Sequence, residues 1–515
     1  MTPSTPQDEI RYDVLVVGGG AAGLAAAVTL GRVRRSVVVV DAGEPRNAPA
    51  AGVHGYLGLD GIAPSELLAT GRDEARRYGA RVIDGRVADL ARLGEGNGGG
   101  FRASLADGTT LTARRVILAT GVADVLPDIP GVAEQWGHGV IHCPYCHGWE
   151  VRDQRVVVIA SGPAGAHQAA LFRQLTDEVT LVVHEGADLD GHTRGSLTAL
   201  GVTIVDEPVA ELVTAGDDVA GVRLRGGTVL AADAVVVGPR IASRVDAAAS
   251  LGVTTAPDPG GMGDIVVTDT SGATAVPGVY AAGNAADLRA QVVHAAAAGS
   301  RVAATINADL LAEEMATPDW DRRYAAHDQM WSGDPNVTLV AEVADHHPGR
   351  ALDVGCGEGA DAIWLASQGW KVTAVDVSGV ALERAEAAAR AAGVTIEWAQ
   401  GDVLSDPPAA DAYDLVSVHY PALPRRRDHA LDALVGAVAP GGTLLVVGHA
   451  PDGADHDEHA RAHGFDPPDY IQPDDIAACL GETWQIDIHE TRPRAAGATG
   501  RSPHTHDTIL KARRR

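Results

Sequence analysis

A short apolar strand, a glycine-rich turn, an alanine-rich helix and a second apolar strand follow one another three times in this chain. The three turns centre on Gly18, Gly162 and Gly355. The flanking strands, such as Val37 to Val40, are apolar runs without alternation, as expected of parallel strands covered on both faces. The 515 residues provide for about three domains. We therefore predict an α/β protein with three nucleotide-binding units.

The net charge of the chain limits its expected partners, and its cysteine content limits its expected disulfides. The chain carries 41 Lys and Arg against 68 Asp and Glu, a net charge of −27, which repels nucleic acid. The first eleven residues show no signal pattern, and the apolar runs are too short to span a bilayer. We therefore expect a cytoplasmic protein with no nucleic-acid or membrane partner. Four cysteines, two of them in one motif, argue against a scaffold of disulfides.

The first turn has the sequence Gly18-Gly19-Gly20-Ala21-Ala22-Gly23. Gly18 would make the tight turn, Gly20 would admit a pyrophosphate, and Gly23 would let helix and strand touch. Asp41 ends the next strand, where its carboxylate can accept hydrogen bonds from ribose hydroxyls. This context favours a dinucleotide site over a purely structural turn.

Two thiols separated by two residues can close a disulfide that accepts and returns an electron pair. Here they are Cys143 and Cys146, and His147 follows them directly. An imidazole titrates near pH 6.5 and can take a proton from a substrate thiol, although a plain core histidine is the alternative. Zinc bound with His138, His142 or His147 is a competing interpretation, and an inert relic is a third. We expect redox use and no metal, with Cys143, Cys146 and His147 as catalytic residues.

The chain up to about residue 312 resembles the thioredoxin reductase family of low-molecular-weight flavoproteins. The resemblance rests on the first turn, on Ile117-Leu118-Ala119-Thr120-Gly121, on Gly278-Val279-Tyr280-Ala281-Ala282-Gly283-Asn284, and on Gln291 and Gly299. It implies an FAD domain split between 1–115 and 245–315, around an NAD(P)-binding-like domain at 116–244 that carries the cysteine pair. It also implies a homodimer. The residues expected to bind FAD are Gly18, Gly20, Ala22, Gly23, Asp41, Asn47, Val87, Gly121, Gly283, Asn284 and Gln291.

The chain departs from this family at several positions. Asn284 stands where the family usually has Asp, and Ala290 stands where it usually has Arg, so the contacts to the ribityl chain should differ. The second turn, Ala160-Ser161-Gly162-Pro163-Ala164-Gly165, lacks its first glycine. His184-Glu185-Gly186 replaces the family's His-Arg-Arg signature for the extra phosphate of NADPH, and Glu185 would repel that phosphate. We therefore expect NAD(P)H to bind poorly.

By the same resemblance, Cys146 should face the flavin and Cys143 should exchange with the substrate's sulfur. The Cys-x-x-Cys-His-Gly motif and the decayed nicotinamide site are most similar to dithiol oxidases of the gliotoxin and holomycin type. Those enzymes close a small molecule's dithiol and pass the electrons through FAD to oxygen. The alternatives are an NAD(P)H-dependent reductase of a thioredoxin-like protein and a flavin redox sensor. His294, expected beside the flavin, would assist or be structural.

The third unit reads Leu352-Asp353-Val354-Gly355-Cys356-Gly357-Glu358-Gly359. Its glycines would let a nucleoside lie against the strand end, Asp376 would hold both ribose hydroxyls, and Asp402 would lie near adenine. The segment from about 320 resembles class I S-adenosylmethionine methyltransferases. We place this domain at 346–515, after a linker or lid at 316–345 that includes Trp331 to Asn336. The residues expected to bind S-adenosylmethionine are Asp353, Gly355, Gly357, Gly359, Asp376 and Asp402.

The methyl acceptor is less constrained by the sequence. Methyl transfer mainly needs a nucleophile held in line with the sulfonium, and a thiolate needs little acid or base help. His419-Tyr420-Pro421 differs from the Asn-Pro-Pro-Tyr of many amino-group methylases, and His419 would be a base or a pocket wall. His456, His459 and His463 would lie on a solvated helix or bind a metal, and Cys356 and Cys479 would be packing residues. We predict a bifunctional enzyme for a small dithiol and a small methyl acceptor.

Overall fold

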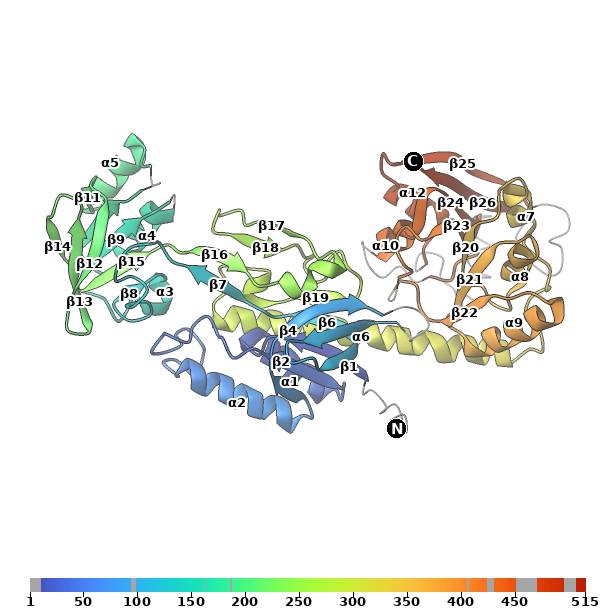
Figure 1. Cartoon of the computed structure of the whole chain (residues 1–515), viewed down its shortest axis with the longest axis horizontal. Coiled ribbons are helices and arrows are strands. Elements are labelled where there is room, and N and C mark those ends of the chain that lie inside the picture. The colour runs from blue at the N-terminus through green and yellow to red at the C-terminus, as the bar shows by residue number, and fades with distance from the viewer. Residues whose placement is uncertain are drawn as a thin grey trace. The chain divides into compact units, whose positions relative to one another are not determined.

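The computed structural model describes residues 11–93, 99–162, 164–185, 188–404, 407–423, 430–450, 470–494 and 506–515 (Figure 1). Residues of three sequence motifs lie outside these ranges, namely Pro163, Gly186 and the histidines at 456, 459 and 463. The chain divides into two compact units, the first ending at Thr305 and the second including everything described from Ile306 onward. Each unit is considered by itself below.

The first sheet has the strand order β3-β2-β1-β6-β5-β4, and β19 pairs with β6. Strands β1, β2, β3 and β6 run parallel, and helices α1 and α2 follow β1 and β2 in the sequence. Val14, Val16 and Val38 in its centre are fully buried. The elements are β1 (Arg11–Val17), α1 (Ala21–Arg32), β2 (Val37–Asp41), α2 (Pro64–Arg77), β3 (Arg81–Asp84), β4 (Val87–Arg92), β5 (Phe101–Leu105), β6 (Thr110–Leu118) and β19 (Val279–Ala281).

The second sheet has the order β11-β10-β9-β15-β8 and is parallel throughout. It is interrupted in sequence by the antiparallel strands β12, β13 and β14. Strands β7 (Val122–Val125) and β16 (Arg240–Ser243) pair with each other where the chain enters and leaves this region. The elements are β8 (Val140–Ile141), α3 (Pro144–His147), β9 (Val156–Ala160), α4 (Ala164–Phe172), β10 (Val179–Val183), α5 (Gly191–Ala199), β11 (Thr203–Val205), β12 (Val209–Ala215), β13 (Asp218–Leu224), β14 (Val229–Ala231) and β15 (Ala234–Val237).

The third sheet, in the second unit, has the order β22-β21-β20-β23-β24-β26-β25, and only β26 runs antiparallel to its neighbours. The sheet is therefore mixed rather than purely parallel. The elements are α7 (Val337–Val343), β20 (Arg350–Val354), α8 (Ala360–Ser367), β21 (Lys371–Asp376), α9 (Gly379–Ala392), β22 (Glu397–Gln400), β23 (Tyr413–His419), α10 (Ala430–Gly436), β24 (Val438–His449), α12 (Pro473–Cys479), β25 (Trp484–Pro493) and β26 (His506–Arg514).

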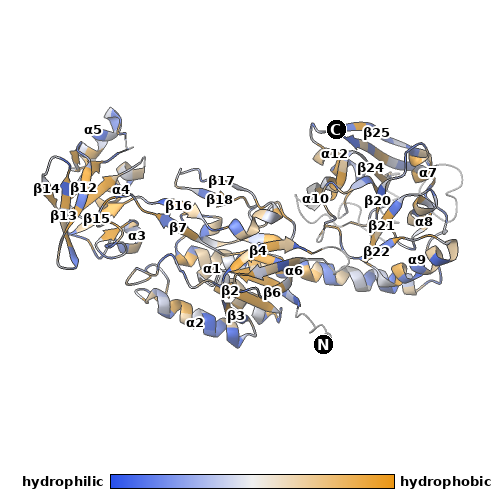
Figure 2. Ribbon diagram, viewed as in Figure 1, coloured by the Kyte–Doolittle hydropathy of each residue, from blue (hydrophilic) through white to orange (hydrophobic). Residues whose placement is uncertain are grey.

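All three sheets place a glycine turn at the same kind of position. The strand order reverses between β1 and β6, between β9 and β15, and between β20 and β23. Each predicted turn follows β1, β9 or β20, at the carboxyl end of that strand. Open α/β sheets bind ligands outside the carboxyl ends of their strands at such reversal points. The central strands are coloured apolar in Figure 2, as expected of a buried sheet.

Helix α6 (Val292–Ala325) runs without interruption through residue 315, where we expected a domain boundary. Its last turns fall inside the segment expected to be a linker or lid. The aromatic residues there suggested a linker, but Tyr324 is almost fully buried, so burial accounts for at least one of them. The domain limits stay predictions. Among the described residues, no helix is long and apolar enough to cross a membrane.

Candidate functional sites

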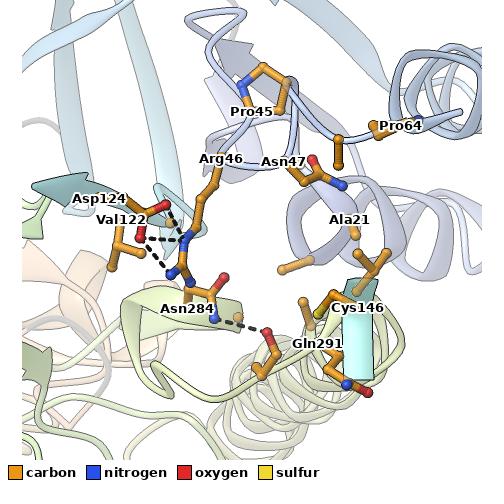
Figure 3. A pocket seen from close by; sticks show the side chains of 18 of the residues that line it. Ala21, Pro45, Arg46, Asn47, Pro64, Val122, Asp124, Cys146, Asn284 and Gln291 are labelled. Atoms are coloured by element: carbon orange, nitrogen blue, oxygen red, sulfur yellow. Dashed lines mark hydrogen bonds and ion pairs between the residues drawn. The ribbon is translucent and has the colours of Figure 1, made fainter. Parts of the chain in front are cut away.

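A cavity of about 800 Å³ lies at the carboxyl ends of β1 and β2 in the first unit. Its wall includes the first glycine turn and helix α3 with Cys143, Cys146 and His147. Figure 3 shows Asn47, Cys146 and Asn284 around this cavity. All but one of the residues predicted to bind FAD line it, namely Gly18, Gly20, Ala22, Asp41, Asn47, Val87, Gly121, Gly283, Asn284 and Gln291.

The exception, Gly23, lies beneath the turn. A side chain at Gly23 would overlap the carbonyl oxygen of Gly18, so this glycine allows helix α1 to pack on the turn. A Cβ at Gly20, in contrast, would meet nothing within 4 Å. Gly20 precedes helix α1, and no side chain caps that helix. The first amide groups of α1 therefore suit an anionic group such as a pyrophosphate.

The side chain of Asn284 binds the loop that follows it. Its Nδ2 donates to the carbonyl oxygens of Asp287 at 2.9 Å, Ala290 at 3.0 Å and Leu288 at 3.4 Å. A carboxylate at this position would have no proton to donate. The amide therefore shapes the loop that leads to Gln291 in the cavity wall.

Asp41 and His294 also have partners in the first unit. The carboxylate of Asp41 forms an ion pair with Arg72 of α2 and accepts a hydrogen bond from the amide of Gly43 at 3.3 Å. The Nδ1 atom of His294 accepts a hydrogen bond from the amide of Gln291 at 3.3 Å. His294 therefore helps to position a predicted FAD contact, which favours the structural interpretation of this residue.

The two sulfur atoms of the cysteine pair lie 2.7 Å apart, and both cysteines are free and half-buried. The thiol of Cys146 donates to Cys143, and the backbone amides of Tyr145 and Cys146 add further hydrogen bonds. Together they lower the pKa of Cys143 to about 7. The contact with Cys143, together with burial, raises the pKa of Cys146. The first negative charge in the reduced pair therefore resides on Cys143.

His147 is a neutral base beside this pair. Burial lowers its pKa, and neither of its buried ring nitrogens has a hydrogen-bond partner among the described residues. His142 is different, because its Nδ1 lies 3.2 Å from both the carbonyl oxygen of Val237 and the amide nitrogen of Gln168. Within the described part of the chain, no group of three or more His, Cys, Asp or Glu side chains is arranged to hold a metal ion.

Sequence reasoning missed a partly buried ion pair in the same cavity. Arg46 makes three hydrogen bonds of 2.6 to 3.1 Å to the carboxylate of Asp124 on β7 (Figure 3). Its positive charge further favours the thiolate form of Cys143. Arg46 adjoins Asn47, which was predicted, but its partner lies far along the chain and no local pattern connects the two.

The strand that follows the second glycine turn and its helix, β10, leads to an acidic residue that already forms an ion pair. Glu185 forms an ion pair with Arg225, the residue after β13. The preceding His184 accepts a hydrogen bond from the amide of Val209 at 3.1 Å, so it supports the backbone. Arg225 is therefore already paired with a carboxylate.

In the second unit, Gly355, Gly357 and Gly359 adopt φ values of 68°, 53° and 82°, which only glycine adopts readily. The carboxylate of Asp376 accepts hydrogen bonds from the amides of Gly357 at 2.8 Å and Ser378 at 2.9 Å. Burial raises its pKa. Asp376 therefore holds the end of its own strand against the glycine turn.

Two further predicted carboxylates of this site are buried. Asp402 accepts a hydrogen bond from the amide of Leu404 at 3.0 Å. Burial and the nearby Asp361 and Asp376 raise the pKa of Asp353 well above its usual value. Cys356 and Cys479 pack against the hydrophobic cores.

The predicted lid segment is hydrogen-bonded to the same turn. The amides of Met330 and Trp331 donate to the carboxylate of Glu358 at 3.0 to 3.2 Å. The indole of Trp331 donates to the hydroxyl of Tyr324 at 3.1 Å, and that hydroxyl would lie 2.8 Å from a Cβ at Gly357. Sequence reasoning missed Tyr324 and Glu358, whose roles depend on this contact.

Comparisons with known proteins cover both halves of the chain. The pyridine nucleotide-disulphide oxidoreductase family matches residues 12–299, and a methyltransferase domain matches residues 351–442. Thioredoxin reductase tcpT of Claviceps purpurea is 34% identical over 310 residues, which are 58% of this chain and 95% of the relative. Thioredoxin reductase sirT of Leptosphaeria maculans is 31% identical over 324 residues, 59% of this chain and 96% of the relative.

Two solved structures agree with these matches. The crystal structure of HlmI is 44% identical with a TM-score of 0.57, and the match covers 61% of this chain and 96% of HlmI. An oxidoreductase from Agrobacterium tumefaciens is 35% identical with a TM-score of 0.54, covering 59% of this chain and 99% of that protein. The predicted resemblance and fold class are confirmed. The chain belongs to the pyridine nucleotide-disulphide oxidoreductase family, as a thioredoxin reductase-like flavoprotein that continues into a methyltransferase domain.

Proposed function

We propose that the flavoprotein half oxidises small dithiols to disulfides with oxygen as the final acceptor, and that the second half methylates a small acceptor from S-adenosylmethionine. One observation carries the first activity. The cysteine pair shares a cavity with the first glycine turn, whereas Glu185 and Arg225 pair with each other at the position where the family binds the extra phosphate of NADPH. Electrons can therefore enter from a thiol more readily than from NADPH.

The cavity fits FAD, because Gly20 leaves open space before an uncapped helix and Asp41 and Asn284 line the same wall. When bound, FAD supplies the two-electron acceptor that restores the enzyme disulfide and passes the electrons to oxygen. We assign to Asn47, Val87, Gly121, Gly283 and Gln291 further contacts along it. The loop ordered by Asn284 would set the position of Gln291 toward this group.

Side chains of this protein carry out the exchange between thiols and disulfides. A substrate thiolate attacks the sulfur of Cys143 in the enzyme disulfide, that bond breaks, and Cys146 leaves as a thiolate. The second substrate thiol then attacks the mixed disulfide, which closes the substrate disulfide and releases Cys143 as a thiolate. Once Cys146 has taken up a proton, its thiol donates to Cys143, and the lowered pKa of Cys143 then makes it a good leaving group. His147, neutral and buried, accepts the proton of the attacking thiol.

Rapid mixing with reduced nicotinamide distinguishes oxidase from reductase. We expect the purified holoprotein to show slow flavin bleaching with NADPH and rapid bleaching with dithiothreitol, followed by oxygen uptake. Cys143→Ser should abolish the dithiol reaction and leave the flavin bound. Rapid bleaching by NADPH would overturn the oxidase assignment and favour the reduction of a thioredoxin-like protein.

The methyl-transfer half fits S-adenosylmethionine through the left-handed glycine turn and the buried Asp376 and Asp402. Both carboxylates keep lone pairs for hydroxyl or amino donors of a nucleoside. Asp376→Ala should weaken binding of S-adenosylmethionine in titration calorimetry, because it removes a ribose contact and an anchor of the turn. Failure of the intact protein to bind the donor would overturn this half of the proposal.

A further inference from the structure

A buried polar cluster lies at the carboxyl end of β23, across the strand reversal from the donor turn. The register of β20 and β23 pairs Val354 with Val418, so His419 comes opposite Gly355. His419 therefore borders the turn expected to hold the methyl donor. Ligands at strand reversals contact residues from both of the diverging strands.

Of the two ring nitrogens of His419, Nδ1 has polar neighbours, whereas Nε2 has no partner in the described part of the chain. The side chain of His419 is 4% exposed, and Nδ1 lies 3.0 Å from the hydroxyl of Ser417 and 3.7 Å from Oδ2 of Asp361. Nε2 is fully buried and has no hydrogen-bond partner among the described residues. Burying a nitrogen without a hydrogen-bond partner is unfavourable, so a ligand that pairs with Nε2 would remove this cost.

Asp361 is fixed in the orientation that a protonated imidazole would need. It lies in the first turn of α8, just after Gly359, and accepts hydrogen bonds from the backbone and side-chain amides of Asn336 at 2.6 and 2.7 Å. Burial lowers the pKa of His419, whereas the charges of Asp361 and Asp507 oppose that effect. The ring is therefore neutral at rest, and these carboxylates stabilise the cation once it accepts a proton.

We propose that His419 is the general base for the methyl acceptor, and that this acceptor is a small thiol that still carries its proton when it binds. The inference rests on the proposed methyltransferase function and deepens it. Nε2 removes the thiol proton as the sulfur attacks the donor's methyl carbon. A new sulfur–carbon bond forms, the methyl–sulfonium bond breaks, and a thioether leaves as the by-product. The proton then passes from His419 to solvent.

A thiol acceptor would need such a base, because a thiol attacks far better after it loses its proton. An ordinary thiol has a pKa of about 8.5 and is only a few per cent ionised at neutral pH. The charged groups that act on His419 are Asp361 on α8 and Asp507 on β26, and the ring of Tyr420 lies beside it.

The test compares two thiols that differ in acidity in the full-length protein. Dithiothreitol keeps its protons at neutral pH, whereas thiophenol is largely ionised. We expect His419→Asn to bind S-adenosylmethionine as tightly as the wild type in calorimetry. It should lower kcat/KM for dithiothreitol methylation on the order of 100-fold and change that for thiophenol little. The deficit should shrink as the pH approaches the thiol's own pKa of about 8.5.

A matched control is His489→Asn on β25, which breaks an exposed pair with Asp474 of α12 in the same domain and should change neither thiol's rate. Loss of donor binding by the wild type would refute the methyltransferase function itself. Given donor binding, the inference about His419 is overturned by any of three results. These are equal losses for both thiols, no loss for dithiothreitol, or a wild-type protein that methylates neither thiol.

Discussion

At the scale of single residues, the position of one proton decides which cysteine reacts. The thiol of Cys146 donates to Cys143, which lowers the pKa of Cys143 to about 7 and raises that of Cys146. The family resemblance implied that Cys143 exchanges with the substrate, and this electrostatic asymmetry favours the same role. At neutral pH about half of the reduced molecules would carry a Cys143 thiolate.

This asymmetry predicts selective alkylation of the reduced protein. Because a lowered pKa means that the proton leaves earlier as the pH rises, iodoacetamide should label Cys143 with a midpoint near the pKa of about 7. Cys146→Ala removes the donor and should move the midpoint toward the usual thiol value of about 8.5, while Cys146→Ser keeps a hydroxyl donor and should move it less. Peptide mass spectrometry at a series of pH values measures both. Preferential labelling of Cys146 would contradict the prediction.

At the scale of elements, sequence patterns identify features that are formed by residues close together in the chain. The turn at Gly18 and the turn at Gly355 each join a strand to a helix within a few residues, so spacing alone predicted them. The Arg46–Asp124 and Asn336–Asp361 contacts join separate elements, and no spacing rule links them. Helix α6 continued past the expected boundary for a similar reason, since burial of Tyr324 depends on the fold around it.

The loop after β19 gives a prediction at this scale. Asn284→Asp should destabilise the protein by about 1–3 kcal/mol, because a carboxylate cannot donate to the carbonyl groups of Asp287, Leu288 and Ala290. Those oxygens should raise the pKa of the introduced carboxyl group. It would then regain a proton, and one donor, as the pH falls, so the loss should be larger at neutral than at acidic pH.

Thermal unfolding of the flavin-free protein, monitored by circular dichroism at several pH values, measures this loss. Asn47→Asp adds the same charge to the same cavity without facing these carbonyl groups, and it is the matched control. Equal destabilisation by both variants would show that charge in the cavity, rather than the lost hydrogen bonds, is responsible.

At the scale of the whole molecule, the two chemistries draw on different parts of the chain. Every residue that lines the cavity precedes Thr305, whereas the donor turn, its carboxylates and His419 all follow Ile306. Both proposed activities act on sulfur, so one dithiol has two fates. Closure to a disulfide protects both sulfurs reversibly, whereas methylation blocks them permanently. A single polypeptide would supply both activities in equal amounts.

Because different parts of the chain form the two sites, we predict that the two activities are independent. Cys143→Ser should abolish dithiol oxidation, because the substrate would have no disulfide to attack. Methyl transfer to thiophenol should stay unchanged, since the cysteine pair and the donor turn belong to different compact units. Measuring both reactions on the same preparation checks that the variant is folded. If Cys143→Ser, or reduction of the wild-type cysteine pair, altered methyl transfer while donor binding stayed normal, the flavoprotein half would act as a redox sensor for the methyltransferase.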